Sequence, residues 1–202
     1  MPSPRILVIF AHPLFEKSRI NKTLVHSIPV HANITFRDLY ELYPEFNIHV
    51  EEEKRLLLNH DLIVWHHPFY WYNCPPLLKQ WIDMVLEVGW AYGPGGIALK
   101  GKKLIQVITT GSPSMTYQPE GFHKHSLHTF LSPFRQTVHL CHMEYLPPFV
   151  VHGTHRLTDA EVREFGLLYA KLYDELLHGE AKHVEYDEHL HMNEWLRQLQ
   201  AS

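Results

Sequence analysis

The sequence predicts an α/β fold built on one parallel sheet of five strands. Short apolar runs alternate with segments of helical periodicity along the chain. In the run Arg5–Phe10 (RILVIF) every residue after Arg5 is apolar, which is typical of a parallel strand covered on both faces. A length of 202 residues, with 45% of them apolar, suits one compact domain with a full core.

Each strand is a short run of apolar or alternating residues, and each is followed by a helix. That alternation implies right-handed crossovers between parallel strands. The strands are expected at Arg5–Phe10, Asn33–Leu39, Asp61–His67, Lys103–Thr110 and Glu144–Val151.

The helices show apolar residues at helical spacing and recognisable start signals. Pro75 suits a first helical turn, and Thr158 with Glu161 three residues later forms a capping box. Lys79 and Asp83, four residues apart, are interpreted as a surface ion pair. The helices are expected at Ser18–Ile28, Val50–His60, Pro75–Val88, Thr129–Cys141 and Thr158–His178.

The chain divides into a domain over residues 1–178 and a polar extension over residues 179–202. A short helix is expected in the extension at Asp187–Leu199, which could pack on a partner subunit. Its histidines do not suggest a metal site, because His189 and His191 are two residues apart and would not share a helix face. With no HExxH or CxxC motif, no metal is expected.

Composition excludes several classes of partner and environment. The formal charge is -4 and no basic block is present, which argues against nucleic acid. No apolar run reaches the roughly 18 residues of a membrane span, and Met1–Arg5 does not begin a signal peptide. Cys74 and Cys141 are interpreted as reduced thiols without a catalytic role. We therefore expect a cytoplasmic protein.

The loop after the first strand has the features of an anion site. Ser18 suits the N-cap of the following helix, whose free amides and dipole attract a phosphate. Arg19 and Asn21 add a cation and an amide. The absence of GxxxxGK and GxGxxG disfavours a nucleoside triphosphate or dinucleotide bound in those modes. The alternative is a capped helix without a ligand.

The loop after the third strand carries four consecutive aromatic residues, Phe69–Tyr72, between prolines. A planar ligand would use the faces of such rings, and a rigid backbone would bond its edge. The alternatives are a hydrophobic plug and a dimer contact. His66 and His67, which end this strand, are interpreted as structural histidines.

The loop after the fourth strand, Thr109–Pro113, is made of small residues that let the backbone approach a ligand. Tyr117 and His123 follow, and a phenol and an imidazole near a redox centre can stabilise charge or move protons. Ordinary loop residues are the alternative. The three loops share the sheet edge where ligands bind in this architecture, and together they suit flavin mononucleotide (FMN).

Several segments carry a family resemblance through their order and separation. They are Ala11–Pro13 with Ser18 and Asn21, Asp38–Tyr40, Tyr43–Phe46, His67–Tyr72, Pro75–Lys79 with Trp81–Asp83, Gly89–Gly96, and Thr109–Gly111. Over residues 4–178 the chain resembles the flavodoxin-like NAD(P)H quinone oxidoreductases. It is most similar to bacterial ancillary subunits of glutathione-gated potassium efflux systems. The resemblance implies a flavodoxin-like three-layer sandwich with strand order 2-1-3-4-5.

The resemblance also implies a homodimer with a flavin in each of two interfacial sites. The phosphate and ribityl end would be held by His12, Ser18, Arg19, Ile20 and Asn21. The flavin ring would be lined by Pro68, Phe69, Tyr70, Trp71 and Tyr72. Its pyrimidine edge would be held by Thr109, Thr110, Gly111 and Ser112.

Three further positions are interpreted through the resemblance. Tyr117 and His123 match a tyrosine and a histidine that stabilise charge during hydride transfer in the animal enzymes. Ser112 replaces a glycine of many relatives, and a serine would be strained there if the position needed a positive φ. The segment Trp90–Gly96 would shape the pocket mouth from one subunit, or be a plain connecting turn.

The function implied is an FMN-dependent NAD(P)H:quinone oxidoreductase that transfers two electrons as hydride by a ping-pong mechanism. FMN is favoured over FAD because the chain resembles the shorter bacterial members. The alternative is a flavin-binding regulatory subunit that docks on a membrane potassium efflux transporter, peripheral to the inner membrane. A plain electron carrier is disfavoured by the modest charge of -4 and by the aromatic loop.

Overall fold

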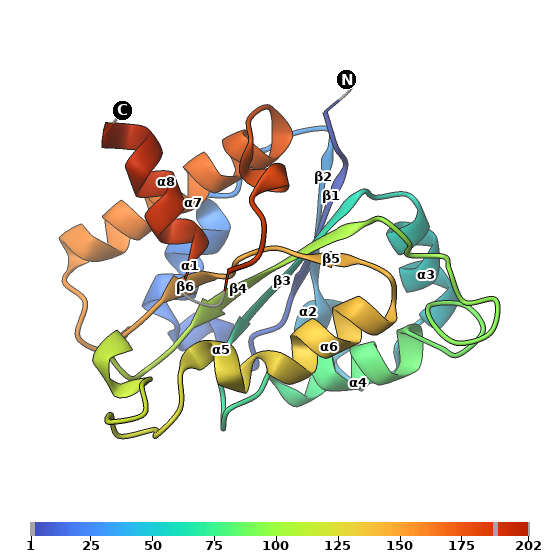
Figure 1. The fold of residues 1–202 in the computed structure, drawn as a ribbon, viewed down its shortest axis with the longest axis horizontal. Helices are drawn as coiled ribbons and strands as arrows, with labels where there is room; N and C mark the ends of the chain where they lie inside the picture. Colours follow the sequence, from blue (N-terminus) through green and yellow to red (C-terminus); the bar gives the residue numbers. More distant parts are fainter. Residues whose placement is uncertain (1–2, 188–189, 202) are drawn as a thin grey trace.

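The computed structural model describes residues 3–187 and 190–201 and shows one parallel sheet between two helical layers (Figure 1). Its strands run in the order β2-β1-β3-β4-β5, and β6 also pairs with β4. The predicted order 2-1-3-4-5 is confirmed. The strands are β1 (Ile6–Phe10), β2 (Ile34–Asp38), β3 (Leu62–Pro68), β4 (Lys103–Thr109), β5 (Glu144–Tyr145) and β6 (Phe149–Val151).

The fifth predicted strand, Glu144–Val151, is interrupted. Its first part pairs with the start of β4 and its second part with the end of β4. The residues between them are 146–148, and Pro147 and Pro148 have no N–H to donate to a sheet ladder. The break therefore follows from the two prolines, while both parts keep the predicted place beside β4.

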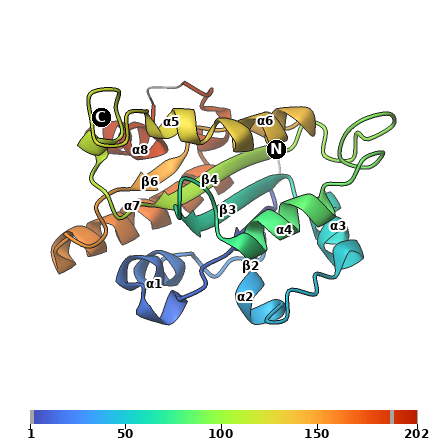
Figure 2. The ribbon, with the colours of Figure 1, turned by 90° about the horizontal axis from the view of Figure 1, so that it is seen from below.

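Helices cover both faces of the sheet (Figures 1 and 2). One face packs under α1 (Arg19–His26), α7 (Asp159–Leu177) and α8 (Met192–Ala201). The other packs under α2 (Leu39–Leu42), α3 (Val50–Leu58), α4 (Pro76–Val85), α5 (Leu127–Phe130) and α6 (Ser132–Leu140). Short 3-10 turns lie at Phe15–Lys17, Ser114–Thr116 and Ala181–His183.

The predicted helix Thr129–Cys141 is divided between α5 and α6, with the junction at Leu131. Pro133 cannot donate to the carbonyl four residues before it, so one continuous helix through this point would lose a hydrogen bond. The capping box of Thr158 and Glu161 is present at the start of α7, and Lys79 pairs with Asp83 on α4 as predicted.

The C-terminal extension packs on its own chain. Met192 N donates to Pro148 O at 2.9 Å, and Asn193 Oδ1 accepts from Val150 N at 2.7 Å, so this side chain bonds the open edge of β6. Met192 and Leu196 are buried against the α7 side of the sheet. The predicted helix Asp187–Leu199 is found as α8, later in the chain, and residues 188–189 lie outside the described residues.

Two more features bear on function. Both cysteines are free and buried, and burial raises the pKa of Cys74 to about 12 and of Cys141 to about 11, which disfavours a reactive thiolate. Within residues 3–187 and 190–201, no helix has both the length and the apolar character needed to cross a membrane.

Candidate functional site

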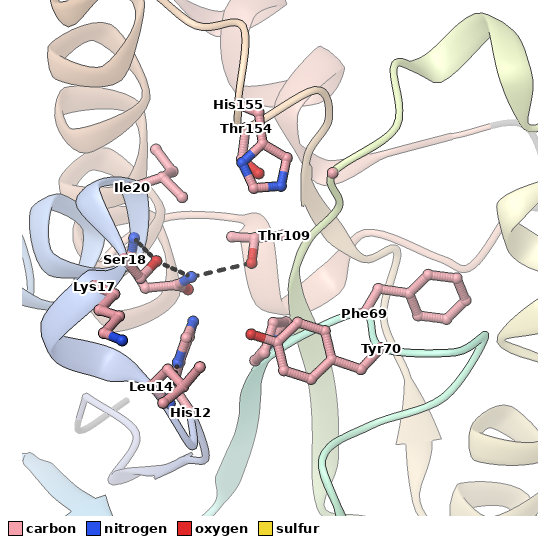
Figure 3. Close-up of a pocket in the computed structure, with 13 residues that line it drawn as sticks. His12, Leu14, Lys17, Ser18, Ile20, Phe69, Tyr70, Thr109, Thr154 and His155 are labelled. Atoms are coloured by element: carbon pink, nitrogen blue, oxygen red, sulfur yellow. Dashed lines mark hydrogen bonds between the residues drawn. The ribbon is translucent and has the colours of Figure 1, made fainter.

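A pocket of about 390 Å³ opens at the carboxyl ends of β1, β3 and β4 (Figure 3). Side chains from the loops after these strands surround it. The residues predicted for cofactor binding that line it are His12, Ser18, Ile20, Asn21, Pro68, Phe69, Tyr70, Thr109 and Gly111. Loops separated by up to about a hundred residues are thus brought together, because parallel strands end at one edge of the sheet.

The N-terminus of α1 forms one wall of this pocket. Ser18 Oγ accepts from Asn21 N at 3.3 Å, which makes Ser18 the predicted N-cap. The first intrahelical bond runs from Lys22 N to Ser18 O at 3.1 Å. The amides of Arg19 and Ile20 precede that bond and lack intrahelical acceptors, so they can serve an anion. This wall is therefore suited to a phosphate.

The Arg19 side chain is not part of the pocket. Its Nη1 donates to Asp159 Oδ1 at 2.5 Å and its Nη2 donates to Leu157 O, both at the start of α7. The ion pair turns the guanidinium away, so the cation expected from Arg19 is replaced by Lys17, which lines the pocket. Arg19 can contribute its backbone N–H alone.

The pocket includes residues that the sequence reasoning missed. Thr154 and His155 line it from the loop after β6, together with Leu14 and Lys17 from the loop after β1. His155 and Thr154 point inward opposite Tyr70 (Figure 3). The signal that could have found them is their position directly after the fifth predicted strand, which is the criterion that identified the other loops.

The aromatic loop forms a tight turn over Tyr70–Asn73. Tyr70 and Asn73 exchange two backbone hydrogen bonds of 2.9 Å. The two residues between them, Trp71 and Tyr72, have φ of 49° and 63°, the combination found in type I′ turns. Left-handed φ is costly for aromatic residues, and such strain clusters at functional sites. The turn leaves Trp71 93% exposed.

A second pocket of about 180 Å³ adjoins the first. It is lined by Phe69, Trp71, Tyr72, Gly111, Ser112, Tyr117 and His123. Phe69 and Gly111 line both pockets, so the two spaces are adjacent at these residues. The first space is bordered by hydroxyls and a helix N-terminus and the second by aromatic rings, a division that suits a ligand with an anionic tail and a planar head.

Hydrogen bonds to the Ser112 carbonyl hold the loop after β4 in place. Thr110 Oγ1 donates to Ser112 O at 2.8 Å, and Gly153 N donates to the same carbonyl at 2.9 Å. Thr110 is buried and lines neither pocket, so it orders the loop. A Cβ on Gly111 would lie 3.2 Å from the His155 ring, which is tight packing.

Ser112 lies outside the positive-φ region, so the strain considered for a serine at this position does not arise. It lines the second pocket. The segment Trp90–Gly96 lines neither pocket of its own chain and lies beside α3, away from the carboxyl ends of the strands (Figure 1).

Tyr117 and His123 are brought together in the second pocket. Their rings stack with centroids 4.4 Å apart and planes 20° apart. His123 Nδ1 lies 3.4 Å from Tyr72 OH, and its buried Nε2 has no hydrogen-bond partner among the described residues. Burial raises the pKa of Tyr117, so its phenol stays protonated near neutral pH. The pair thus presents groups that can donate or exchange protons.

His12 contributes a neutral imidazole to the first pocket. Its Nδ1 accepts from Leu14 N at 3.1 Å, and burial lowers the pKa of His12. With Nδ1 used as an acceptor, the ring proton of the neutral form is on Nε2. This imidazole can therefore donate one hydrogen bond without placing a charge in the pocket.

Two curated relatives and two solved structures are similar to this chain. The uncharacterized NAD(P)H oxidoreductase YdeQ of Bacillus subtilis is 38% identical over 100% of this chain and 98% of its own. The glutathione-regulated potassium-efflux system ancillary protein KefG of Pectobacterium carotovorum is 44% identical over 76% of this chain and 84% of its own.

The two structures share the fold. General stress protein 14 of Treponema denticola, solved in complex with FMN, is 40% identical with a TM-score of 0.81, over 86% of this chain and 99% of that chain. An NADPH-quinone reductase from P. pentosaceus is 31% identical with a TM-score of 0.76, over 84% and 96%. Residues 4–168 match a family described by its flavodoxin-like fold. The predicted resemblance is confirmed, and the chain belongs to this flavodoxin-like family.

Proposed function

We propose that this protein is an FMN-dependent NAD(P)H:quinone oxidoreductase. The observation that carries the proposal is the pair of adjacent pockets, one suited to an anion and one to a planar ring, that share Phe69 and Gly111 as lining residues. Support comes from a 40% identical structure in complex with FMN and from relatives named NAD(P)H oxidoreductase and NADPH-quinone reductase.

The residues of the first pocket fit a phosphate ester. The amides of Arg19 and Ile20, the hydroxyls of Ser18 and Thr109, and the Lys17 ammonium would hold it at the start of α1. Because no adenine site is needed to fill these two pockets, FMN is the proposed flavin and FAD the alternative.

The residues of the second pocket fit an isoalloxazine ring. The aromatic turn at Trp71 and Tyr72 would lie against it, and the backbone at Gly111 and Ser112 would approach its polar edge. Glycine suits position 111, because a side chain there would meet His155. When bound, FMN supplies the redox chemistry, accepting hydride from NAD(P)H and passing it to an acceptor.

The protein's own groups then act on the acceptor. Tyr117, which burial keeps protonated, would donate a hydrogen bond to a quinone oxygen. His123, stacked on it, would hold or supply a proton at the same edge of the pocket. We propose a ping-pong order, in which nicotinamide and quinone occupy the same open space in turn, and parallel double-reciprocal plots are the expected kinetic result.

The decisive experiment is an absorbance spectrum of purified protein incubated with FMN or FAD and then desalted. We expect the protein to retain FMN, and we expect the absorbance band at about 450 nm to bleach when NADPH is added without oxygen. A Gly111→Val variant, whose side chain would meet His155, should retain less flavin. Failure of the wild-type protein to retain either flavin would refute the proposal.

A homodimer with its sites at the subunit interface is part of this proposal. Large apolar side chains are exposed on the two loops that line the second pocket, with Trp71, Phe122 and Met115 each more than 70% exposed. A second copy covering them would remove this apolar surface from water and close the ring pocket. Sedimentation velocity should show a dimer, and a monomer that retains FMN and activity would contradict this part.

The second candidate function is a regulatory subunit of a potassium efflux transporter. It is favoured by the 44% identity to KefG, named as an ancillary protein of such a system. Both functions can coexist in one flavoprotein. Copurification of the tagged protein with a membrane transporter, and potassium efflux from cells with and without it, would support this role. Full activity without any effect on efflux would exclude it.

A further inference from the structure

A line of buried hydrogen bonds runs from the first pocket into the core. Asn21 stands at its outer end, where Nδ2 donates to Ser18 Oγ at 2.9 Å and to Thr109 Oγ1 at 3.1 Å (Figure 3). Asn21 Oδ1 lies 3.0 Å from His66 Nε2. Asn21 and His66 are both buried, and His66 does not line the pocket, so it can affect a ligand only through Asn21.

Two tyrosines of α7 extend the line beyond His66. His66 Nδ1 lies 3.1 Å from Tyr169 OH, which lies 3.0 Å from Tyr173 OH. Burial lowers the pKa of His66 well below its usual value, so the ring is neutral and carries one proton. An amide oxygen can only accept, so Nε2–H donates to Asn21 and Nδ1 accepts from the Tyr169 hydroxyl, which accepts from Tyr173.

This order of donors fixes the direction of two hydroxyls in the pocket. Ser18 Oγ accepts from Asn21 Nδ2 and from Asn21 N, so both of its acceptor positions are used. Thr109 Oγ1 also accepts from Asn21 Nδ2. Each hydroxyl therefore keeps its proton for a further partner, and both line the pocket.

The opposite orientation of the Asn21 amide would reverse this result. Its oxygen would then face Ser18 and Thr109 and accept a hydrogen bond from each hydroxyl. The two hydroxyl oxygens would then present only lone pairs to the pocket. A phosphate dianion needs donors, since its own oxygens are acceptors. The orientation of one buried amide thus decides whether the two hydroxyls attract or repel an anion.

We propose that His66 is a positioning residue for anion recognition: its Nε2–H holds the Asn21 amide so that Ser18 and Thr109 both donate to a phosphate monoester at the start of α1. This inference rests on the proposed FMN site and adds to it a residue outside the pocket. It predicts that His66 acts on the phosphate of the ligand and has little effect on the ring.

The first test is the tautomer of His66, read from long-range nitrogen-15 NMR of the flavin-free protein. An Nε2–H imidazole is expected, while an Nδ1–H imidazole would overturn the proposal whatever ligands bind. Inorganic phosphate is then titrated into the same sample. Shifts at the Asn21 amide that saturate with phosphate are expected in wild type and should be weakened in the variant below.

The second test compares FMN with riboflavin, which lacks the phosphate, by quenching of flavin fluorescence. His66→Leu should lower FMN affinity about tenfold and riboflavin affinity less than about twofold. His66→Gln, whose amide can donate to Asn21, should restore most of the FMN affinity. Tyr173→Phe is the matched control, because it removes a buried hydroxyl while leaving the donor from His66 to Asn21 in place.

The outcomes separate this inference from the proposed function. Equal losses for FMN and riboflavin in His66→Leu would mean a purely structural histidine and would overturn the inference. If wild type binds phosphate but neither flavin, the proposed function fails and the inference is judged on phosphate alone. If wild type binds neither phosphate nor flavin, both are refuted. Should His66→Leu not fold, His66→Leu/Tyr169→Phe removes the hydroxyl left without an acceptor.

Discussion

Tyr117 and His123 stack face to face in the second pocket, with ring centroids 4.4 Å apart. Each comes from the long loop after β4, and His123 N donates to Thr116 O at 3.0 Å, which closes the loop between them. The phenol and the imidazole are thereby held as one unit beside the aromatic turn. Their arrangement makes the predicted catalytic pair testable separately from cofactor binding.

Replacing both groups should slow quinone reduction without releasing flavin. In Tyr117→Phe/His123→Gln we expect kcat to fall about a hundredfold, because the acceptor oxygen loses its proton donors. Flavin retained after desalting should match wild type. The control is His125→Gln, an exposed histidine two residues away that lines neither pocket. Unchanged quinone reduction in the double variant would show that the pair is not catalytic.

Replacing Trp71 by glycine in the strained turn should raise stability and lower FMN affinity. Trp71→Gly removes the steric cost of a φ of 49°, whereas Trp71→Ala keeps it, so the glycine variant should be more stable by about 1 kcal/mol. Both should bind FMN roughly tenfold more weakly, because both lose the ring. Urea unfolding and flavin titration check this; equal stabilities would mean that the turn stores no strain.

Much of this site follows from one rule applied to the sequence. Ser18, Phe69 and Gly111 were predictable because each comes shortly after an apolar run, and parallel strands end at one edge. The same rule applied after Val151 would have added Thr154 and His155. The interruption of the fifth strand could also be predicted, because two adjacent prolines cannot donate to a sheet ladder.

Other features depend on contacts that sequence spacing does not reveal. Arg19 turns away from the pocket because Asp159, 140 residues later, accepts from it. Trp71 and Tyr72 take left-handed φ without glycine or asparagine at either position, so the local sequence does not signal the turn. The role of His66 depends on Asn21, 45 residues away, and on Tyr169, 103 residues away.

Acid should destabilise the fold between pH 6.5 and about 4. Burial lowers the pKa of His67 to about 4, and burial together with nearby His191 lowers the pKa of His152 to about 4. Because the unfolded chain binds protons below about pH 6.5 and the folded protein resists them, stability is full above that pH and is lost as pH falls.

The loss should be on the order of 3 kcal/mol for each histidine. His67 Nδ1–H donates to Pro68 O at 3.0 Å and its Nε2 accepts from Gln106 Nε2 at 3.0 Å, so it fits the predicted structural role. His152→Gln should flatten the dependence of unfolding free energy on pH, measured by urea titration from pH 7.5 to 4.5. A variant curve parallel to wild type would contradict the assignment.

A buried carboxylate joins β2, α3 and α4 on the face of the sheet opposite α1. Glu53 accepts from Arg37 Nη2 at 2.6 Å, Tyr43 OH at 2.7 Å and Trp81 Nε1 at 2.9 Å, and it is fully buried. Burial, with a smaller contribution from Glu53, raises the pKa of Tyr43 to about 12, which keeps its phenol a donor.

Glu53→Ala should therefore be severely destabilising, by about 3–5 kcal/mol, because it leaves the Arg37 guanidinium and two buried donors without their shared acceptor. Glu52 offers a matched control: it pairs with the same arginine at 3.1 Å but its side chain is 40% exposed, so Glu52→Ala should cost less than about 1 kcal/mol. Urea unfolding measures both. Since neither carboxylate lines either pocket of the site, the folded fraction of each variant should retain flavin as wild type does. Equal destabilisation by the two substitutions would show that the burial of Glu53 does not determine how much it contributes to stability.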